Sequence, residues 1–98
     1  MADKEEIIEV LKKVVDPEIQ YDIYSLGLIY NIDIEGKKVK ITMTLTSPMC
    51  PYGPALIDDV RRQVSSVEGV GEVAVELTFS PVWSPEKMSD EAKIALGI

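Results

Sequence analysis

The residue best suited to chemistry in this 98-residue sequence is its single cysteine, Cys50. It lies in the segment Thr-Ser-Pro-Met-Cys-Pro, between an expected strand and an expected helix. Helix N-termini present unpaired N–H groups and partial positive charge, which stabilise a thiolate. The thiolate is the form of cysteine that binds metals and attacks electrophiles. We expect Cys50 to be the functional thiol, and the alternative is a buried, inert cysteine that only packs.

Four polar residues are candidates to share a pocket with Cys50. Asp16 and Glu18 lie in the first loop, and Thr46 and Ser47 close the second strand. If the first loop folds over the Cys50 segment, carboxylates and hydroxyls meet the thiolate, and Asp16 and Glu18 become weaker candidate ligands beside it. Each also has an ordinary interpretation: Asp16 as an acceptor for backbone N–H groups, Glu18 as a solvated side chain, and Thr46 as a normal strand residue.

The composition excludes several classes of function. Histidine is absent, so the chain holds neither a Ser-His-Asp nor a Cys-His arrangement, nor a histidine metal site. The formal net charge of −7 disfavours nucleic acids and anionic membranes. A lone cysteine is typical of a reducing compartment, and the polar, acidic start is unlike a signal peptide, so we expect a cytoplasmic protein.

The helices and strands that must position these residues can be predicted from the sequence pattern, and they indicate one α+β domain over residues 1–98. Apolar spacing predicts a helix over 3–15, a structured loop over 16–27 and a second main helix that begins near Pro54. Expected strands cover 28–35, 38–46 and 72–79, and a short C-terminal helix covers 90–96. The first two strands should form an antiparallel hairpin, and the third should run parallel to the second. The result is a small mixed three-stranded sheet packed with two main helices, and Trp83 either plugs the core edge or forms part of a partner surface.

Five stretches together resemble the SufT/PaaD-like family of iron–sulfur cluster assembly domains. The similarity runs from about residue 7 to Ile98. The matching stretches are Asp16-Pro-Glu-Ile19, Leu26-Gly-Leu-Ile-Tyr30, Thr42 through Pro51, Val70 through Phe79, and Pro81-Val-Trp-Ser-Pro85 followed by Met88-Ser89. The family often has an acidic residue where Ser25 stands and a proline where Val82 stands. By the motif match, Cys50 takes the position of the family's functional cysteine, with Asp16, Glu18 and Thr46 at polar positions that accompany it.

The resemblance implies the fold of the C-terminal domain of NifU-like scaffolds and a role in iron–sulfur cluster assembly or maturation. Under this hypothesis the chain binds iron or a cluster transiently through Cys50, holds no tightly bound cofactor, and works with scaffold or client proteins. Common clusters need about four thiolates or equivalent ligands, so a homodimer or a partner would have to supply the rest. The alternatives are an adaptor that binds no cluster and a thiol-dependent enzyme; we expect that the chain is not an enzyme.

Overall fold

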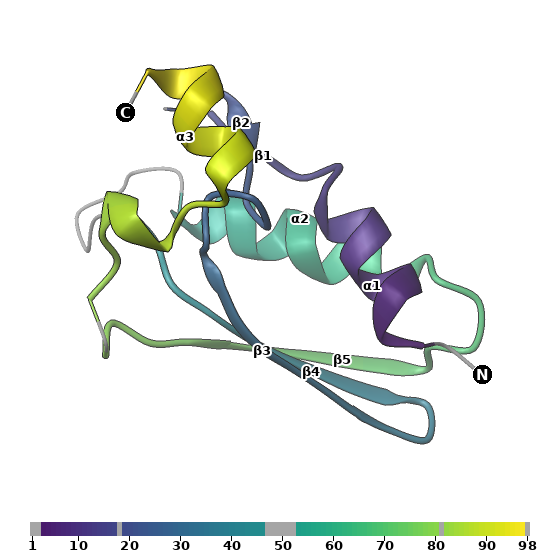
Figure 1. Cartoon of the computed structure of the whole chain (residues 1–98). Helices are drawn as coiled ribbons and strands as arrows, with labels where there is room; N and C mark the ends of the chain where they lie inside the picture. The colour runs from purple at the N-terminus through teal and green to yellow at the C-terminus, as the bar shows by residue number, and fades with distance from the viewer. Residues whose placement is uncertain (1–2, 18, 47–52, 81, 98) are drawn as a thin grey trace.

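The computed structural model describes residues 3–17, 19–46, 53–80 and 82–97. Its main layer is a three-stranded sheet in the order β3-β4-β5, with helices on one of its faces (Figure 1). The strands are β3 (Ile29–Glu35), β4 (Lys38–Met43) and β5 (Glu72–Leu77), and the helices are α1 (Lys4–Leu11), α2 (Gly53–Ser65) and α3 (Asp90–Leu96). The predicted α+β class is therefore confirmed.

The strand pairing follows the prediction. β3 and β4 form an antiparallel hairpin with Ile34 opposite Val39, and β4 runs parallel to β5 with Ile41 opposite Val75. The parallel pair is joined through α2, which lies on the helical face of the sheet (Figure 1). Apolar side chains at alternate positions of β4 point into the core because successive residues of a strand face opposite sides.

The core is formed where α1 and α2 cover the sheet. Its members are at most 8% exposed and share apolar character: Ile7, Leu11, Val14, Ile23, Leu26, Leu28, Val39, Ile41, Met43, Leu45, Leu56, Val60, Val64, Val67, Met88 and Ala92. Residues of the loop after α1 and of the segment before α3 join this cluster, so both are fixed by the same burial that orders the helices.

The first helix is shorter than the predicted range 3–15. Asp3 caps it, because its side chain accepts a hydrogen bond from the backbone N–H of Glu6 at 2.9 Å. The helix ends at Leu11, and Val15 and Asp16 instead form a short strand, β1. β1 (Val15–Asp16) pairs antiparallel with β2 (Tyr21–Asp22), so part of the predicted loop 16–27 is a second, two-stranded sheet.

The predicted strand over 38–46 is also too long. β4 ends at Met43, and the next residue, Thr44, is fully buried although alternation placed it on the open face. Its backbone N–H donates to the carbonyl of Leu28 at 2.8 Å, and its hydroxyl donates to the carbonyl of Leu45 at 3.4 Å. Burial of Thr44 is tolerated because both groups find acceptors.

The C-terminal region packs back on the loop before β3. The indole N–H of Trp83 donates to the carbonyl of Leu26 at 2.7 Å, and the backbone N–H of Ser89 donates to the carbonyl of Ser25 at 2.8 Å. Trp83 is half-buried, which favours the core-edge interpretation over a free partner surface. A short 3₁₀ helix, η1 (Pro85–Lys87), separates it from α3, which Ser89 caps.

Candidate functional site

The site predicted from sequence centres on Cys50, which lies outside the described residues, as do Glu18 and Ser47. The described flanks of the Cys50 segment are Thr46 and Gly53. They belong to one packed region, since a side-chain carbon built on Gly53 would lie 2.8 Å from Cδ1 of Leu45. The site can therefore be described through the elements around it: the end of β4, the start of α2 and the β1 segment.

The β1 segment lies against the beginning of α2. Val15 and Pro17 line a hollow together with Ala55, Leu56 and Asp59 of the helix. This hollow brings residues of the first loop to the first two turns of α2, the helix that Cys50 precedes by three positions in the sequence. The sequence hypothesis requires the first loop to approach the Cys50 segment. The described residues show that this loop and the start of α2 line one hollow, whereas the approach to Cys50 itself lies outside them.

Asp16 is buried to 1% exposure and holds the loop together. Its Oδ1 accepts a hydrogen bond from the backbone N–H of Ile19 at 3.2 Å, and its backbone carbonyl accepts one from the N–H of Gln20 at 2.7 Å. Gln20 has a positive φ of 62°, which is uncommon for a residue with a side chain and marks a tight turn. The carboxylate of Asp16 thus has a structural task, namely to stabilise the turn between β1 and β2.

Thr46 follows the end of β4 and is half-buried. It stands at the last described position before the Cys50 segment, and the prediction that it closes the strand is wrong because β4 ends three residues earlier. Val15 and Pro17, the neighbours of Asp16, line a hollow with α2, and Leu45, the neighbour of Thr46, lies close to Gly53 of the same helix.

The first turn of α2 carries no acidic side chain. This matters because the partial positive charge of a helix N-terminus is reduced when a carboxylate lies beside it. The acidic residues come one turn later, where Asp58 and Asp59 both bind Arg62, at 3.2 Å and 2.6 Å. The beginning of the helix therefore keeps its positive end, and the carboxylates nearby are already engaged with a cation.

Asp59 is the residue that sequence reasoning missed. Its place in the helix indicated only a favourable position relative to the helix dipole, yet it lines the hollow with Val15 and Pro17. Its spacing of three residues from Leu56 puts both on one side of α2, which was the available signal. The identity of the element that packs there could not be read from that spacing.

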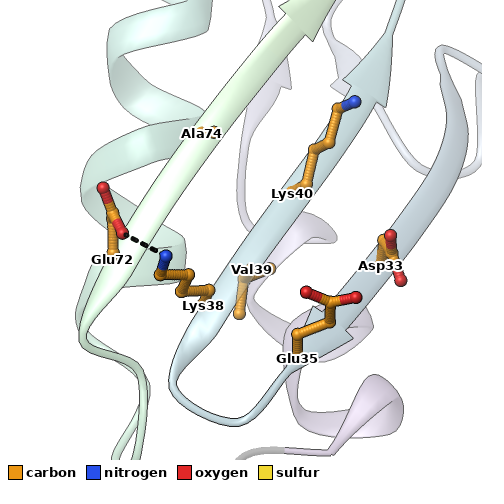
Figure 2. Close-up of a pocket in the computed structure, with 7 residues that line it drawn as sticks. All are labelled: Asp33, Glu35, Lys38, Val39, Lys40, Glu72 and Ala74. Atoms are coloured by element: carbon orange, nitrogen blue, oxygen red, sulfur yellow. Dashed lines mark ion pairs between the residues drawn. The ribbon is translucent and has the colours of Figure 1, made fainter.

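A second hollow, on the open face of the sheet, is a poor candidate for a binding site. It is lined by Asp33, Glu35, Lys38, Val39, Lys40, Glu72 and Ala74 (Figure 2). Its lysines already have partners, since Lys38 lies 3.9 Å from Glu72 and Lys40 lies 2.8 Å from Glu76. The hydrogen bond and charge of Glu76 raise the pKa of Lys40 above its usual 10.5, with a smaller contribution from Asp33. The face is a ladder of charges that neutralise one another across strands.

Among the described residues, no group of three or more cysteine, aspartate and glutamate side chains is placed to hold a metal ion. Nor does the described part of the chain include a helix long and apolar enough to cross a bilayer.

Comparison with known proteins gives consistent matches. The model of the iron–sulfur cluster assembly protein family matches residues 4–76. A Porphyromonas gingivalis protein named Fe-S protein maturation auxiliary factor is 48% identical over 95 residues, which cover 96% of this chain and 90% of that protein. The Staphylococcus aureus Fe-S protein maturation auxiliary factor SufT is 41% identical over 86 residues, covering 87% of this chain and 98% of the relative. These matches confirm the resemblance inferred from the sequence motifs.

The fold has a solved counterpart as well. The crystal structure of a domain of unknown function from Bacillus anthracis superposes with a TM-score of 0.91 at 41% sequence identity. The superposition covers 97% of this chain and 92% of that one.

Proposed function

This chain belongs to the iron–sulfur cluster assembly protein family, and we propose that it is a maturation factor that holds iron or a cluster transiently and passes it to client proteins. The observation that carries the proposal is the hollow that Val15 and Pro17 line together with the first two turns of α2, the helix that follows Cys50 in the sequence. A cytoplasmic location and an absence of enzymatic turnover are part of the same proposal.

The ligand set explains why the cargo would be held only briefly. The sequence has one cysteine and no histidine, whereas common clusters use about four thiolates or equivalent ligands. Cys50 can contribute one thiolate, and a second copy, a partner or a small thiol must contribute the others. A cluster that depends on ligands from two molecules is released when they separate, which suits transfer rather than storage.

The start of α2 gives Cys50 a favourable electrostatic neighbour. The first turn of a helix presents N–H groups that have no partner within the helix, and the first turn of α2 has no carboxylate of its own. Its partial positive charge favours anionic groups nearby, including a thiolate or a cluster with negative charge. Asp58 and Asp59 would oppose this effect, but Arg62 binds both of them.

Asp16 is proposed as a residue that positions the loop rather than as a ligand. Its Oδ1 already accepts the N–H of Ile19, and it is almost completely buried. Glu18 and Ser47 stay in the proposed pocket with Thr46 as polar neighbours of Cys50. A thiol enzyme is the weaker candidate because the sequence has no histidine base and no second cysteine to resolve an oxidised thiol.

The test is anaerobic reconstitution with iron and sulfide of the wild type and Cys50→Ser, followed by absorbance and iron content. The proposal predicts a cluster chromophore in the wild type that is lost in Cys50→Ser, while both proteins have the same far-ultraviolet circular dichroism. No chromophore in either protein, with client binding intact in both, would replace the carrier by an adaptor that works through partners alone.

Asp16 can be tested in the same assay with two substitutions. Asp16→Asn keeps an oxygen acceptor for the N–H of Ile19 but removes the charge, whereas Asp16→Ala removes both. If Asp16 positions the loop, Asp16→Asn retains iron content and Asp16→Ala loses stability, by about 1–3 kcal/mol for a buried N–H left without its acceptor. Loss of iron in a folded Asp16→Asn protein would instead make the carboxylate a ligand.

A further inference from the structure

Two neighbouring hollows lie along β3, which is an edge strand of the three-stranded sheet. One is lined by Gly27, Ile29, Tyr30 and Lys87, and the other by Lys4, Tyr24, Ile29, Tyr30, Asn31 and Ile32. They share Ile29 and Tyr30, so they form one strip along β3, which we call the β3 groove. In the described part of the chain, β3 pairs with β4 on one side and has no strand on the other.

The β3 groove combines tyrosine and lysine side chains with apolar ones. The ammonium group of Lys87 lies 5.2 Å from the centre of the Tyr30 ring, and that of Lys12 lies 5.8 Å from the centre of the Tyr24 ring. Both distances are within the range of a cation–π interaction, which holds each lysine near its ring. With Lys4 at the other end, three lysines surround two tyrosines.

The charge of the groove is opposite to that of the molecule. The chain has 17 acidic and 10 basic residues, yet none of the described aspartates and glutamates lines either hollow. Glu5 and Glu86 are sequence neighbours of the groove lysines but do not line it. Charges are screened over about 8 Å at physiological ionic strength, so a ligand in the groove interacts mainly with the nearby lysines rather than with the net charge of −7.

The backbone at this place is irregular. The register between β3 and β4 shifts between Ile29 and Asn31, so Tyr30 is the extra residue of a β-bulge. Bulges occur at sheet edges and redirect a side chain out of the regular ladder. Here the redirected side chain is Tyr30, the aromatic residue common to both hollows.

We propose that the β3 groove is a docking site for an extended, acidic segment of a partner protein. Extended segments bind along the free edges of sheets, where side chains at alternate positions enter pockets beside the strand. Glutamate or aspartate side chains of such a segment would pair with Lys4 and Lys87, and its apolar side chains would lie on Tyr24 and Tyr30. This inference does not depend on whether Cys50 binds iron.

The experiment measures fluorescence anisotropy of a labelled octapeptide of alternating glutamate and valine, in 0.15 M salt and without iron. Matched peptides replace every glutamate by glutamine or by lysine. The glutamate peptide is expected to bind at least tenfold more tightly than either matched peptide. Equal binding of the three peptides, or no binding of the glutamate peptide at millimolar protein, would overturn the proposal.

Charge reversal tests the location. Lys4→Glu combined with Lys87→Glu should weaken binding of the glutamate peptide at least about tenfold, because both side chains are exposed and line the groove. The control is Lys13→Glu combined with Arg61→Glu, which changes the net charge equally at exposed positions outside the groove. The control double variant should change the affinity for the glutamate peptide by less than twofold. If the two double variants lose affinity equally, the peptide does not bind in the β3 groove.

A second copy of the chain is the competing occupant, since α1 itself begins with the acidic residues Glu5 and Glu6. Sedimentation of the wild type and of the Lys4→Glu, Lys87→Glu variant distinguishes the two. The proposal predicts the same oligomeric state for both proteins. A wild-type dimer that dissociates in the variant would assign the groove to self-association instead.

Discussion

Substitution of Gly27 by alanine should destabilise the protein far more than the same substitution at Gly36. Both glycines have a positive φ, 80° and 60°, which costs a residue with a side chain about 1–2 kcal/mol. They differ in their surroundings. A Cβ on Gly27 would lie 2.2 Å from the backbone oxygen of Lys87, whereas a Cβ on Gly36 meets nothing within 4 Å.

The expected magnitudes follow from that difference. Gly36→Ala should lower the free energy of unfolding by the conformational cost alone, about 1–2 kcal/mol. Gly27→Ala adds a clash with backbone atoms of η1, which cannot rotate away like a flexible side chain, and overpacking of this kind costs about 1–3 kcal/mol more. The total for Gly27→Ala is then about 2–5 kcal/mol. A loss of 1 kcal/mol lowers the melting temperature of a domain of this size by roughly 4–8 °C.

Urea unfolding followed by circular dichroism measures both variants against the wild type. The clash should also displace Lys87, so Gly27→Ala should weaken binding of the acidic peptide in the β3 groove while Gly36→Ala leaves it unchanged. If the two variants lose equal stability, the close approach of Gly27 to η1 is wrong.

The other predictions concern the last helix and the open face of the sheet. Ser89→Ala should lower the free energy of unfolding by about 1 kcal/mol, because the hydroxyl of Ser89 accepts the backbone N–H of Ala92 at the start of α3. Ser84→Ala should leave it almost unchanged, because the side chain of Ser84 makes no such bond at η1. Thermal unfolding of the two variants measures the difference. In an NMR titration, the pKa of Lys40 should lie above 10.5 and fall in Glu76→Gln but not in Glu72→Gln. Because the folded-state pKa is raised, this pair stabilises the protein fully below pH 10.5 and loses its effect as the pH rises through the pKa of Lys40 in the folded protein.

The spacing of apolar residues in the sequence was sufficient to predict a helix or strand where one face of that element is buried along its whole length. Val39, Ile41 and Met43 alternate with exposed or half-buried residues in β4, and the hairpin and the parallel neighbour followed from the same pattern. The pattern fails at Thr44, because the chain leaves the ladder there and no longer alternates. A hydroxyl with a backbone acceptor beside it can be buried where an alternation rule predicts exposure.

The β1–β2 sheet could not be predicted for a different reason. Each strand has two residues, too few for a period of two to be recognised. Its place in the fold involves residues that are distant in the sequence, since Val15 and Pro17 line a hollow with Ala55 and Leu56 of α2. The hypothesis that the first loop shares a pocket with Cys50 could be stated from sequence and stays a prediction, because Cys50 lies outside the described residues.

The segment between α1 and β3 connects the candidate site with the β3 groove. Its first residues, Val15 and Pro17, line the hollow at α2, and Tyr24, two residues after β2, lines the groove. The two ends are held together by pairing of β1 with β2 and by Asp22, whose Oδ2 accepts the N–H of Ser25 at 2.8 Å. A partner that moves Tyr24 would act on a short, hydrogen-bonded unit rather than on a free loop, because displacement of β2 strains its pairing with β1. Binding at the groove and the position of the β1 segment beside α2 are therefore expected to be coupled through this unit.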